Sequence, residues 1–487
     1  MKIMFKVKKL IILDKTKSEG KVSELQPADR FQQEIFSSLD EQVSEDSIVR
    51  IIDKVVDKLY EKKDEGKINQ TPEVGRPEYP KKLLLKLYLY GYMNRIKSSR
   101  NLEKECKRNI EVKWLLGKLT PDHWTISNFR KENHQEIKEV IKLFNKFLLD
   151  TGYLEGKIIV IDGTKLKANA PTSGNKYYVD ELKEMVQQTD EKITYYLAAF
   201  NKTDEYEEQL EELRKEKEEL EALIEQLKKQ NKEVYIKTDP DSNIMKTRNG
   251  KIVGYNVQFS CDKKNKLIVA TDINDRTNDF RELRPMYEKS KEMLEKKPEE
   301  ILADAGYYSA DEIEYIEKEE KVITYVAELP EKGNGEFKYN KHRDEYICSQ
   351  GKKLKFETQK YDVRGRKTRT YRCHECRGCP IRIQCTKSAR GRMKIRYVNQ
   401  DFRDEYRNKM MKKKSKEKMR LRKTIIEHPI GTIKLWLGRN PLLLRGKEKV
   451  KTEINMVSFS YNILRIFNID GYERLTNKID KYQWKLA

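Results

Sequence analysis

Five runs of apolar and β-branched residues between positions 157 and 327 limit the possible fold more than any other sequence feature. The first run, KIIVID, has the unbroken apolar character of a buried strand. The runs GKIVGYNVQFSC and NKLIVATDI are joined by Asp262–Asn265 and predict a β-hairpin. The last two runs, EEILAD and KVITYVA, are separated by a helix-like segment. A hairpin followed by alternating strand and helix predicts a mixed sheet of the α/β class.

Residues 76–150 predict a compact all-α domain ahead of the sheet. The run KKLLLKLYLYGYMNRI has the length and apolar density of a buried helix, and Ser98 or Ser99 can cap the next one. A further helix, with Thr125 as a candidate cap, continues to about residue 149. The preceding segment, 1–75, is highly charged and contains one predicted amphipathic helix at 47–60.

The predicted α/β domain spans 151–470, and a tail follows at 471–487. A helical insertion at 180–233 interrupts the domain and carries a seam with alternating steps of four and three residues, typical of a short coiled coil. The seam residues are Tyr206, Leu210, Leu213, Lys217, Leu220, Ile224 and Leu227. Such a helix can dimerise, or it can fold back on a neighbouring helix as a solvated arm.

The charge balance favours a polyanionic partner. Lys and Arg exceed Asp and Glu by 22 in this 487-residue chain, and each phosphate that a cation neutralises releases counterions. The sequence shows no 18-residue apolar run, no signal peptide and no lipidation motif. We therefore expect a soluble, intracellular protein without a membrane partner.

A second insertion, at 335–400, combines clustered cysteines with basic residues. An odd, clustered set of cysteines without a secretion signal argues for metal ligation rather than disulfides. A Cys-x2-Cys knuckle with further cysteines can close a tetrahedral, structural Zn²⁺ site, the alternative being free thiols. The favoured ligands are Cys348, Cys376, Cys379 and Cys385, with Cys373 or His374 as substitutes.

The same insertion is a candidate DNA-binding surface. Residues 341–398 contain 18 Lys or Arg and five acidic residues, with tyrosines interleaved. Such a surface is expected to contact the DNA backbone without reading a base sequence.

Asp162 and Asp304 each follow directly on an apolar run. Either one alone is common as a turn residue. At the carboxyl ends of neighbouring strands, however, both side chains would project into one crevice.

A third candidate acid, Glu427, lies in a basic helical segment. On a continuous helix it would share a face with Lys423 and Lys434, although Pro429 predicts a kink or restart beside it. Three converging carboxylates in a basic protein are typical of a Mg²⁺ site for phosphodiester chemistry.

These segments together resemble the DDE transposases of bacterial insertion sequences, from about residue 75 to 469. The stretch from GRPEYP to TISNFR is similar to the helical transposase N-terminal domain. VIDGTKLKANA, GYNVQFSCDKKNKLIVATDI and ADAGYYS are similar to the segments with the first acid, the hairpin and the second acid. IIEHPIGTIK resembles the segment with the third acid, in which a lysine follows the glutamate.

The resemblance implies a role for particular residues. The implied catalytic, Mg²⁺-binding acids are Asp162, Asp304 and Glu427. Lys434 is implied to contact DNA. Many relatives carry a tyrosine and an arginine before the glutamate, at positions occupied here by Arg420 and Lys423, and Arg422 is the candidate to replace that arginine.

The resemblance also implies a fold, an activity and partners. The core would be ribonuclease H-like, a mixed sheet flanked by helices, and would cut and join DNA with two Mg²⁺ ions per site, which Mn²⁺ could replace. Its partners would be double-stranded DNA, as terminal inverted repeats and as target, and further copies of the chain in a homodimer or higher assembly. A bacterial, cytoplasmic, nucleoid-associated location would follow.

Two alternatives are a nuclease of the same fold, which only hydrolyses DNA, and a non-catalytic DNA-binding protein descended from a transposase. The basic cysteine-rich segment and the N-terminal domain favour transposition over hydrolysis alone. A non-catalytic descendant is expected to have lost an acid, and all three are present.

Overall fold

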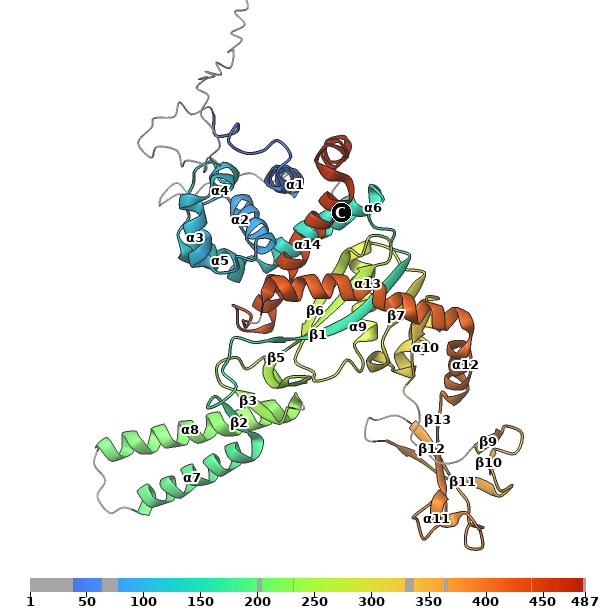
Figure 1. The fold of residues 1–487 in the computed structure, drawn as a ribbon. Helices are drawn as coiled ribbons and strands as arrows, with labels where there is room; N and C mark the ends of the chain where they lie inside the picture. The colour runs from blue at the N-terminus through green and yellow to red at the C-terminus, as the bar shows by residue number, and fades with distance from the viewer. Residues whose placement is uncertain are drawn as a thin grey trace, which may run out of the picture.

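The computed structural model describes residues 38–63, 78–198, 204–230, 232–328, 337–362, 367–438 and 440–484. Most of the predicted N-terminal segment, 1–37 and 64–75, and the last three residues of the predicted tail lie outside these ranges. The described part combines a helical N-terminal region with a mixed α/β sheet, as predicted (Figure 1). None of its helices is both long and apolar enough to cross a bilayer.

Six helices form the N-terminal region: α1 (Ile48–Lys63), α2 (Lys81–Met93), α3 (Ser99–Arg108), α4 (Ile110–Leu115), α5 (His123–Glu132) and α6 (His134–Asp150). The amphipathic helix predicted at 47–60 is α1, and its apolar side is buried. The predicted cap at Thr125 is wrong. Asp122 caps α5 instead, because its carboxylate accepts the N–H groups of Trp124 and Thr125 at 2.8 and 2.9 Å.

The central sheet has six strands: β1 (Ile158–Lys167), β4 (Asn243–Thr247), β5 (Gly250–Asp262), β6 (Ile268–Asn274), β7 (Glu300–Ala303) and β8 (Ile323–Val326). β5 pairs antiparallel with β1, β4 and β6, which confirms the predicted hairpin. β7 pairs in parallel with β1, and β8 in parallel with β7. Helices α9 (Leu283–Leu294) and α10 (Ala310–Lys318) connect the parallel side, so the sheet is mixed.

Two C-terminal helices cover the sheet and join it to the N-terminal region (Figure 1). α13 (Lys413–Leu437) follows α12 (Gln400–Met411) and contacts β1, β5 and β7. α14 (Lys447–Lys481), whose backbone breaks at Gly471, contacts β6 as well as α1, α2, α5 and α6. One continuous apolar core therefore extends from the N-terminal helices into the sheet.

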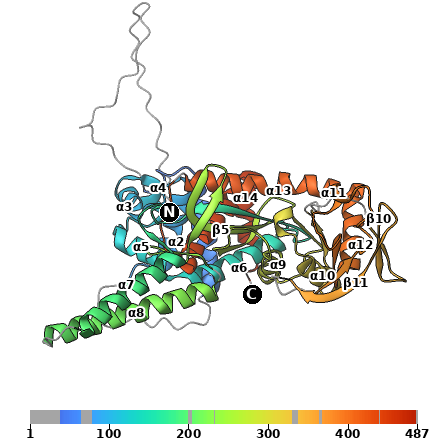
Figure 2. The same ribbon diagram turned by 90° about the horizontal axis from the view of Figure 1, so that it is seen from below.

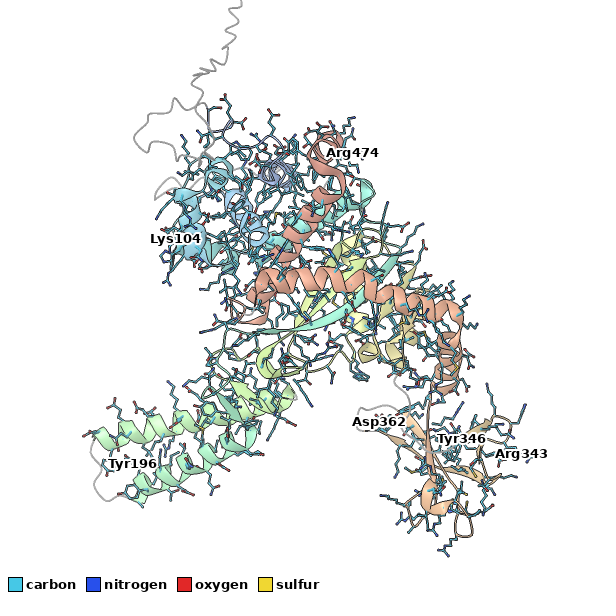
Figure 3. The ribbon with its side chains drawn as sticks, viewed as in Figure 1. Lys104, Tyr196, Arg343, Tyr346, Asp362 and Arg474 are labelled. Carbon is cyan, nitrogen blue, oxygen red and sulfur yellow. The ribbon has the colours of Figure 1, made fainter. Side chains whose placement is uncertain are left out.

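A helical arm and a small sheet project from opposite ends of the central sheet in both views (Figures 1 and 2). The arm consists of β2 (Lys176–Tyr178), α7 (Val179–Ala198), α8 (Asp204–Lys229) and β3 (Val234–Ile236). The small sheet consists of β9 (Phe337–Asn340), β10 (Glu345–Cys348), β11 (Lys353–Tyr361), β12 (Lys367–Arg372) and β13 (Met393–Tyr397), with α11 (Arg382–Cys385) beside it. Tyr196 marks the tip of the arm, and Arg343 and Tyr346 lie on the small sheet (Figure 3).

The predicted coiled-coil seam of α8 faces α7 of the same chain. Ile224 and Leu227 are buried against Leu182, and the Lys217 ammonium lies 2.7 Å from the Asp190 carboxylate. Of the two predicted alternatives, folding back on a neighbouring helix is therefore the one observed.

One buried asparagine secures α14 to the free edge of β6. The Asn462 side chain donates to the carbonyl of Ile268 at 2.7 Å and accepts its N–H at 2.8 Å.

We expect Asn462→Ala to lower the free energy of unfolding by about 2 kcal/mol or more, because it leaves two buried backbone groups unpaired. Urea unfolding of the full chain measures this loss. Asn477→Ala, exposed on the same helix, is the control; an equal loss there would contradict the assignment.

Candidate active site

Asp162 and Asp304 lie side by side on neighbouring parallel strands. β1 and β7 pair with Ile158 opposite Glu300 and Val160 opposite Leu302, and the same offset carried two residues further would set Asp304 opposite Asp162. Asp304 is the first residue after β7, as expected from the sequence. Asp162, in contrast, lies in the middle of β1 and not at the predicted strand end, because β1 continues along the long strand β5 as far as Lys167.

The Asp162 carboxylate is largely buried beneath α13. Its two oxygens accept hydrogen bonds from the Gly163 N–H at 2.9 Å and from Arg422 Nη1 at 3.0 Å. Burial raises the pKa of Asp162 to about 6; the Arg422 charge opposes this shift and the charge of Asp304 adds to it. The two aspartates are thus close enough to influence each other's ionisation.

Asp304 is held by the turn that follows it. Its Oδ1 accepts the Gly306 N–H at 2.8 Å, at the start of the short 3₁₀ helix η1 (Ala305–Tyr307). Burial raises the pKa of Asp304, and the Gly306 hydrogen bond and the Arg422 charge oppose the shift. The turn therefore stabilises the charged form of this carboxylate.

Helix α13 brings two cations toward Asp162. Besides the Arg422 ion pair, partial burial lowers the pKa of Lys434, and the charge of Asp162 opposes that shift. Glu427 lies on α13 between these two residues, but its side chain is exposed, and the structure records no contact between it and the aspartates. Of the predicted kink or restart at Pro429, the restart is absent, since Pro429 lies inside one helix, α13, that runs from Lys413 to Leu437.

The other predicted DNA contacts on this helix, Arg420 and Lys423, are exposed to solvent, and the ion pair with Asp162 is made by Arg422 instead. Exposure on a basic helix leaves both side chains accessible to a phosphate backbone.

The five clustered cysteines, Cys348, Cys373, Cys376, Cys379 and Cys385, line one cavity of about 290 Å³ beside the small sheet. The Arg392 N–H donates to Cys376 Sγ at 3.4 Å. Burial raises the pKa of the Cys373 thiol to about 11, with Cys376 and Cys348 adding to the shift. Across the described ranges, however, no three His, Cys, Asp or Glu side chains are placed to hold a metal ion, at the cysteines or at the aspartates.

A further acid, Asp279, was not singled out from the sequence. It precedes α9 in a turn, and its side chain reaches the segments that carry Asp162 and Asp304. Its sequence context, TNDFRE, shows neither a strand end nor a ligand-like spacing, so no sequence signal pointed to it.

Two transposase families match the chain. The family described as a transposase domain (DUF772) matches residues 37–132, which contain α1 to α5. The transposase DDE domain family matches residues 347–467, which contain Glu427 and Lys434 but neither aspartate. No curated protein and no solved structure matches the chain. With both transposase domains in one polypeptide, the chain is a DDE transposase of the insertion-sequence type.

Proposed function

We propose that this transposase cleaves DNA at the ends of its insertion sequence and joins those ends to target DNA, with Asp162, Asp304 and Glu427 as catalytic acids. The observation that carries the proposal is the placement of the two aspartates side by side beneath a basic helix that bears Glu427. The order β6-β5-β1-β7-β8, antiparallel and then parallel, supports a ribonuclease H-like core.

The donor chemistry fits Mg²⁺, which prefers carboxylate oxygens. Asp162 and Asp304 would hold the metal, with two ions per site and Mn²⁺ as a possible substitute. Bound metal would supply Lewis-acid stabilisation of the charge that develops at phosphorus. Because Glu427 is exposed and makes no contact with the aspartates, the proposal includes a movement of its side chain toward them.

Two displacements at phosphorus then make up the reaction. Water first attacks the phosphodiester at the element's end and loses a proton, the bond from phosphorus to the 3′-oxygen breaks, and that oxygen takes up a proton to become a free 3′-hydroxyl. That hydroxyl next attacks a target phosphodiester, loses its proton and displaces a target 3′-oxygen. The ionised aspartates are the residues that would orient the attacking oxygen, and Lys434, Arg422, Arg420 and Lys423 would bind phosphates.

The basic small sheet would contact the backbone of the terminal repeats or of the target, with the chain acting as a dimer or larger assembly. This sheet, on which Arg343 and Asp362 are labelled, projects away from the central sheet (Figure 3). The numerous cations of this segment would add to DNA affinity by releasing counterions.

Asp162→Asn, Asp304→Asn and Glu427→Gln are each expected to lower strand cleavage by at least about 10²-fold, because each removes a charge that acts in the transition state. A labelled duplex carrying the terminal repeat that flanks the gene measures cleavage and strand transfer, and filter binding on the same duplex should show little change. Glu417→Gln, exposed on α13, is the matched control. A triad variant that cleaves at the normal rate would contradict the assignment, and hydrolysis without joined product would indicate a nuclease.

A structural Zn²⁺ at Cys348, Cys376, Cys379 and Cys385 also belongs to the proposal, supported by the cavity that these cysteines share. Metal analysis of protein purified without chelator is expected to find about one zinc per chain, since the four favoured cysteines supply the four ligands of one tetrahedral site. Cys376→Ser or Cys379→Ser should reduce this value, whereas Cys106→Ala, in the N-terminal helices, should not. Absence of zinc from the wild-type chain would refute the site.

A further inference from the structure

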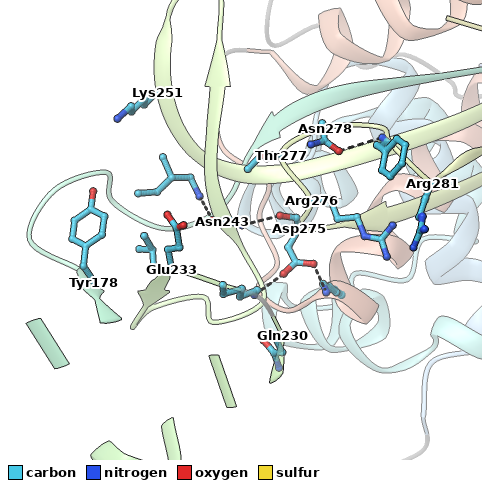
Figure 4. Close-up of a pocket in the computed structure, with 15 residues that line it drawn as sticks. Tyr178, Gln230, Glu233, Asn243, Lys251, Asp275, Arg276, Thr277, Asn278 and Arg281 are labelled. Carbon is cyan, nitrogen blue, oxygen red and sulfur yellow. Dashed lines mark hydrogen bonds and ion pairs between the residues drawn. The ribbon is translucent and has the colours of Figure 1, made fainter. Parts of the chain in front are cut away.

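Asp279 lies in the turn before α9, between a cavity and the catalytic acids. Its neighbours Asn278 and Phe280 line a cavity of about 1050 Å³ at the base of the arm (Figure 4). Asp279 itself does not line this cavity, and its side chain is directed at β5 instead. Its Oδ1 accepts hydrogen bonds from Asn256 Nδ2 and Gln258 Nε2, both at 2.8 Å.

An ordinary role in the turn does not explain this side chain. A turn or capping aspartate accepts the N–H groups of its own segment, whereas Asp279 accepts side-chain amides from a neighbouring strand. The residue at the cap position of α9 is Glu282, which makes no side-chain cap bond. Asn256 and Gln258 are 1% and 0% exposed, so the Asp279 carboxylate supplies the hydrogen-bond acceptor that these two buried side-chain amides need.

The Asp279 carboxylate also lies close to the glycines that stand beside the two proposed catalytic aspartates, Gly163 and Gly306. A Cβ atom added to Gly163 would lie 2.7 Å from Asp279 Oδ1, and one added to Gly306 would lie 3.5 Å from Asp279 Oδ2. The second position is also only 3.0 Å from Asp304 Oδ1. The two glycines thus leave room for a carboxylate that packs against the segments of Asp162 and Asp304.

A chain of hydrogen bonds connects Asp279 to the turn that holds Asp304. Gln258 donates to Asp279 through its amide nitrogen, so its amide oxygen is left to accept the hydroxyl of Tyr307. Tyr307 is completely buried and stands three residues after Asp304, at the end of η1. The acceptor oxygen of Asp279 therefore determines which way the Gln258 amide points, and with it where the Tyr307 hydroxyl is held.

We propose that Asp279 is a positioning residue of the catalytic centre, which orients the Asp304 carboxylate for metal binding through Gln258 and Tyr307. The inference depends on the proposed function, because it assigns Asp279 to the same site. Partners that orient a metal-binding side chain typically change metal affinity or activity 10- to 100-fold when they are removed.

Asp279→Asn and Tyr307→Phe test the two ends of the series of hydrogen bonds that runs from Asp279 through Gln258 to Tyr307. Each is expected to lower the cleavage rate on the terminal-repeat duplex, and the affinity for Mn²⁺ titrated into the full-length protein, by about 10- to 100-fold. DNA affinity should stay within about twofold. The double variant should be no worse than the more severe single variant, because both substitutions break one connected network.

Asn278→Ala is the matched control, since it alters the same turn but leaves the carboxylate in place. Normal cleavage and normal Mn²⁺ affinity in Asp279→Asn would overturn the inference, and so would multiplying effects in the double variant. Should Asp279→Asn fail to fold, Tyr307→Phe alone decides by its Mn²⁺ affinity. Asp162→Asn is measured in the same assays. If Asp162→Asn still cleaves DNA at the normal rate, the proposed function is wrong. If Asp162→Asn is inactive but Asp279→Asn cleaves and binds Mn²⁺ normally, only the role of Asp279 is wrong.

Discussion

The parallel pairing of β1 with β7 is the constraint on which the candidate active site depends. Its offset, carried two residues past the last pair, Val160 with Leu302, brings Asp304 directly after β7 to the level of Asp162 on β1. Because side chains alternate along a strand, a slip of one residue would turn one aspartate to the opposite face of the sheet. Pairing with β5 holds β1 in register over nine residue pairs, from Ile159 to Lys167, and the apolar core beneath both strands disfavours any slip.

Two carboxylates at such close range cost free energy unless cations or N–H groups offset their charge. The structure provides both kinds of partner, through Arg422 on α13 and through the backbone N–H groups of Gly163 and Gly306. The same helix carries Glu427 and Lys434, so one element both neutralises the aspartates and carries the remaining residues of the predicted site. The packing of α13 across β1, β5 and β7 is thus as important to this site as the strands themselves.

Strong, uninterrupted apolar patterns could be predicted from the sequence. The hairpin β5–β6, the strands β7 and β8 and the amphipathic helix α1 are all where their periodicity places them. The extension of β1 beyond Asp162 could not be predicted, because pairing with β5, and not local composition, continues the strand through Gly163. The five strands β9–β13 were missed as well, since they carry no long apolar run and most of their side chains are at least partly exposed, as in β11.

The acidic residues around the candidate site also differ in how far the sequence could predict them. Asp162 and Asp304 stand out because each follows an apolar run, whereas Asp279 acquires its surroundings only when the turn before α9 folds against β5. Glu427 was singled out as a third acid on the basic helical segment and again through the resemblance, but its side chain is exposed and makes no contact with the aspartates, which the sequence spacing does not reveal. Local patterns therefore identify the residues on the strands, and tertiary contacts decide which other acids join them.

The acidic arm restricts how DNA can reach the sheet. Its two helices contain 16 Asp or Glu and only seven Lys or Arg, in a chain that is otherwise strongly basic. Phosphates that come within about 10 Å of such a surface at 0.1 M salt are repelled. Such repulsion would turn a duplex away from the end of the sheet where the arm begins and toward α13 and the small basic sheet at the opposite end.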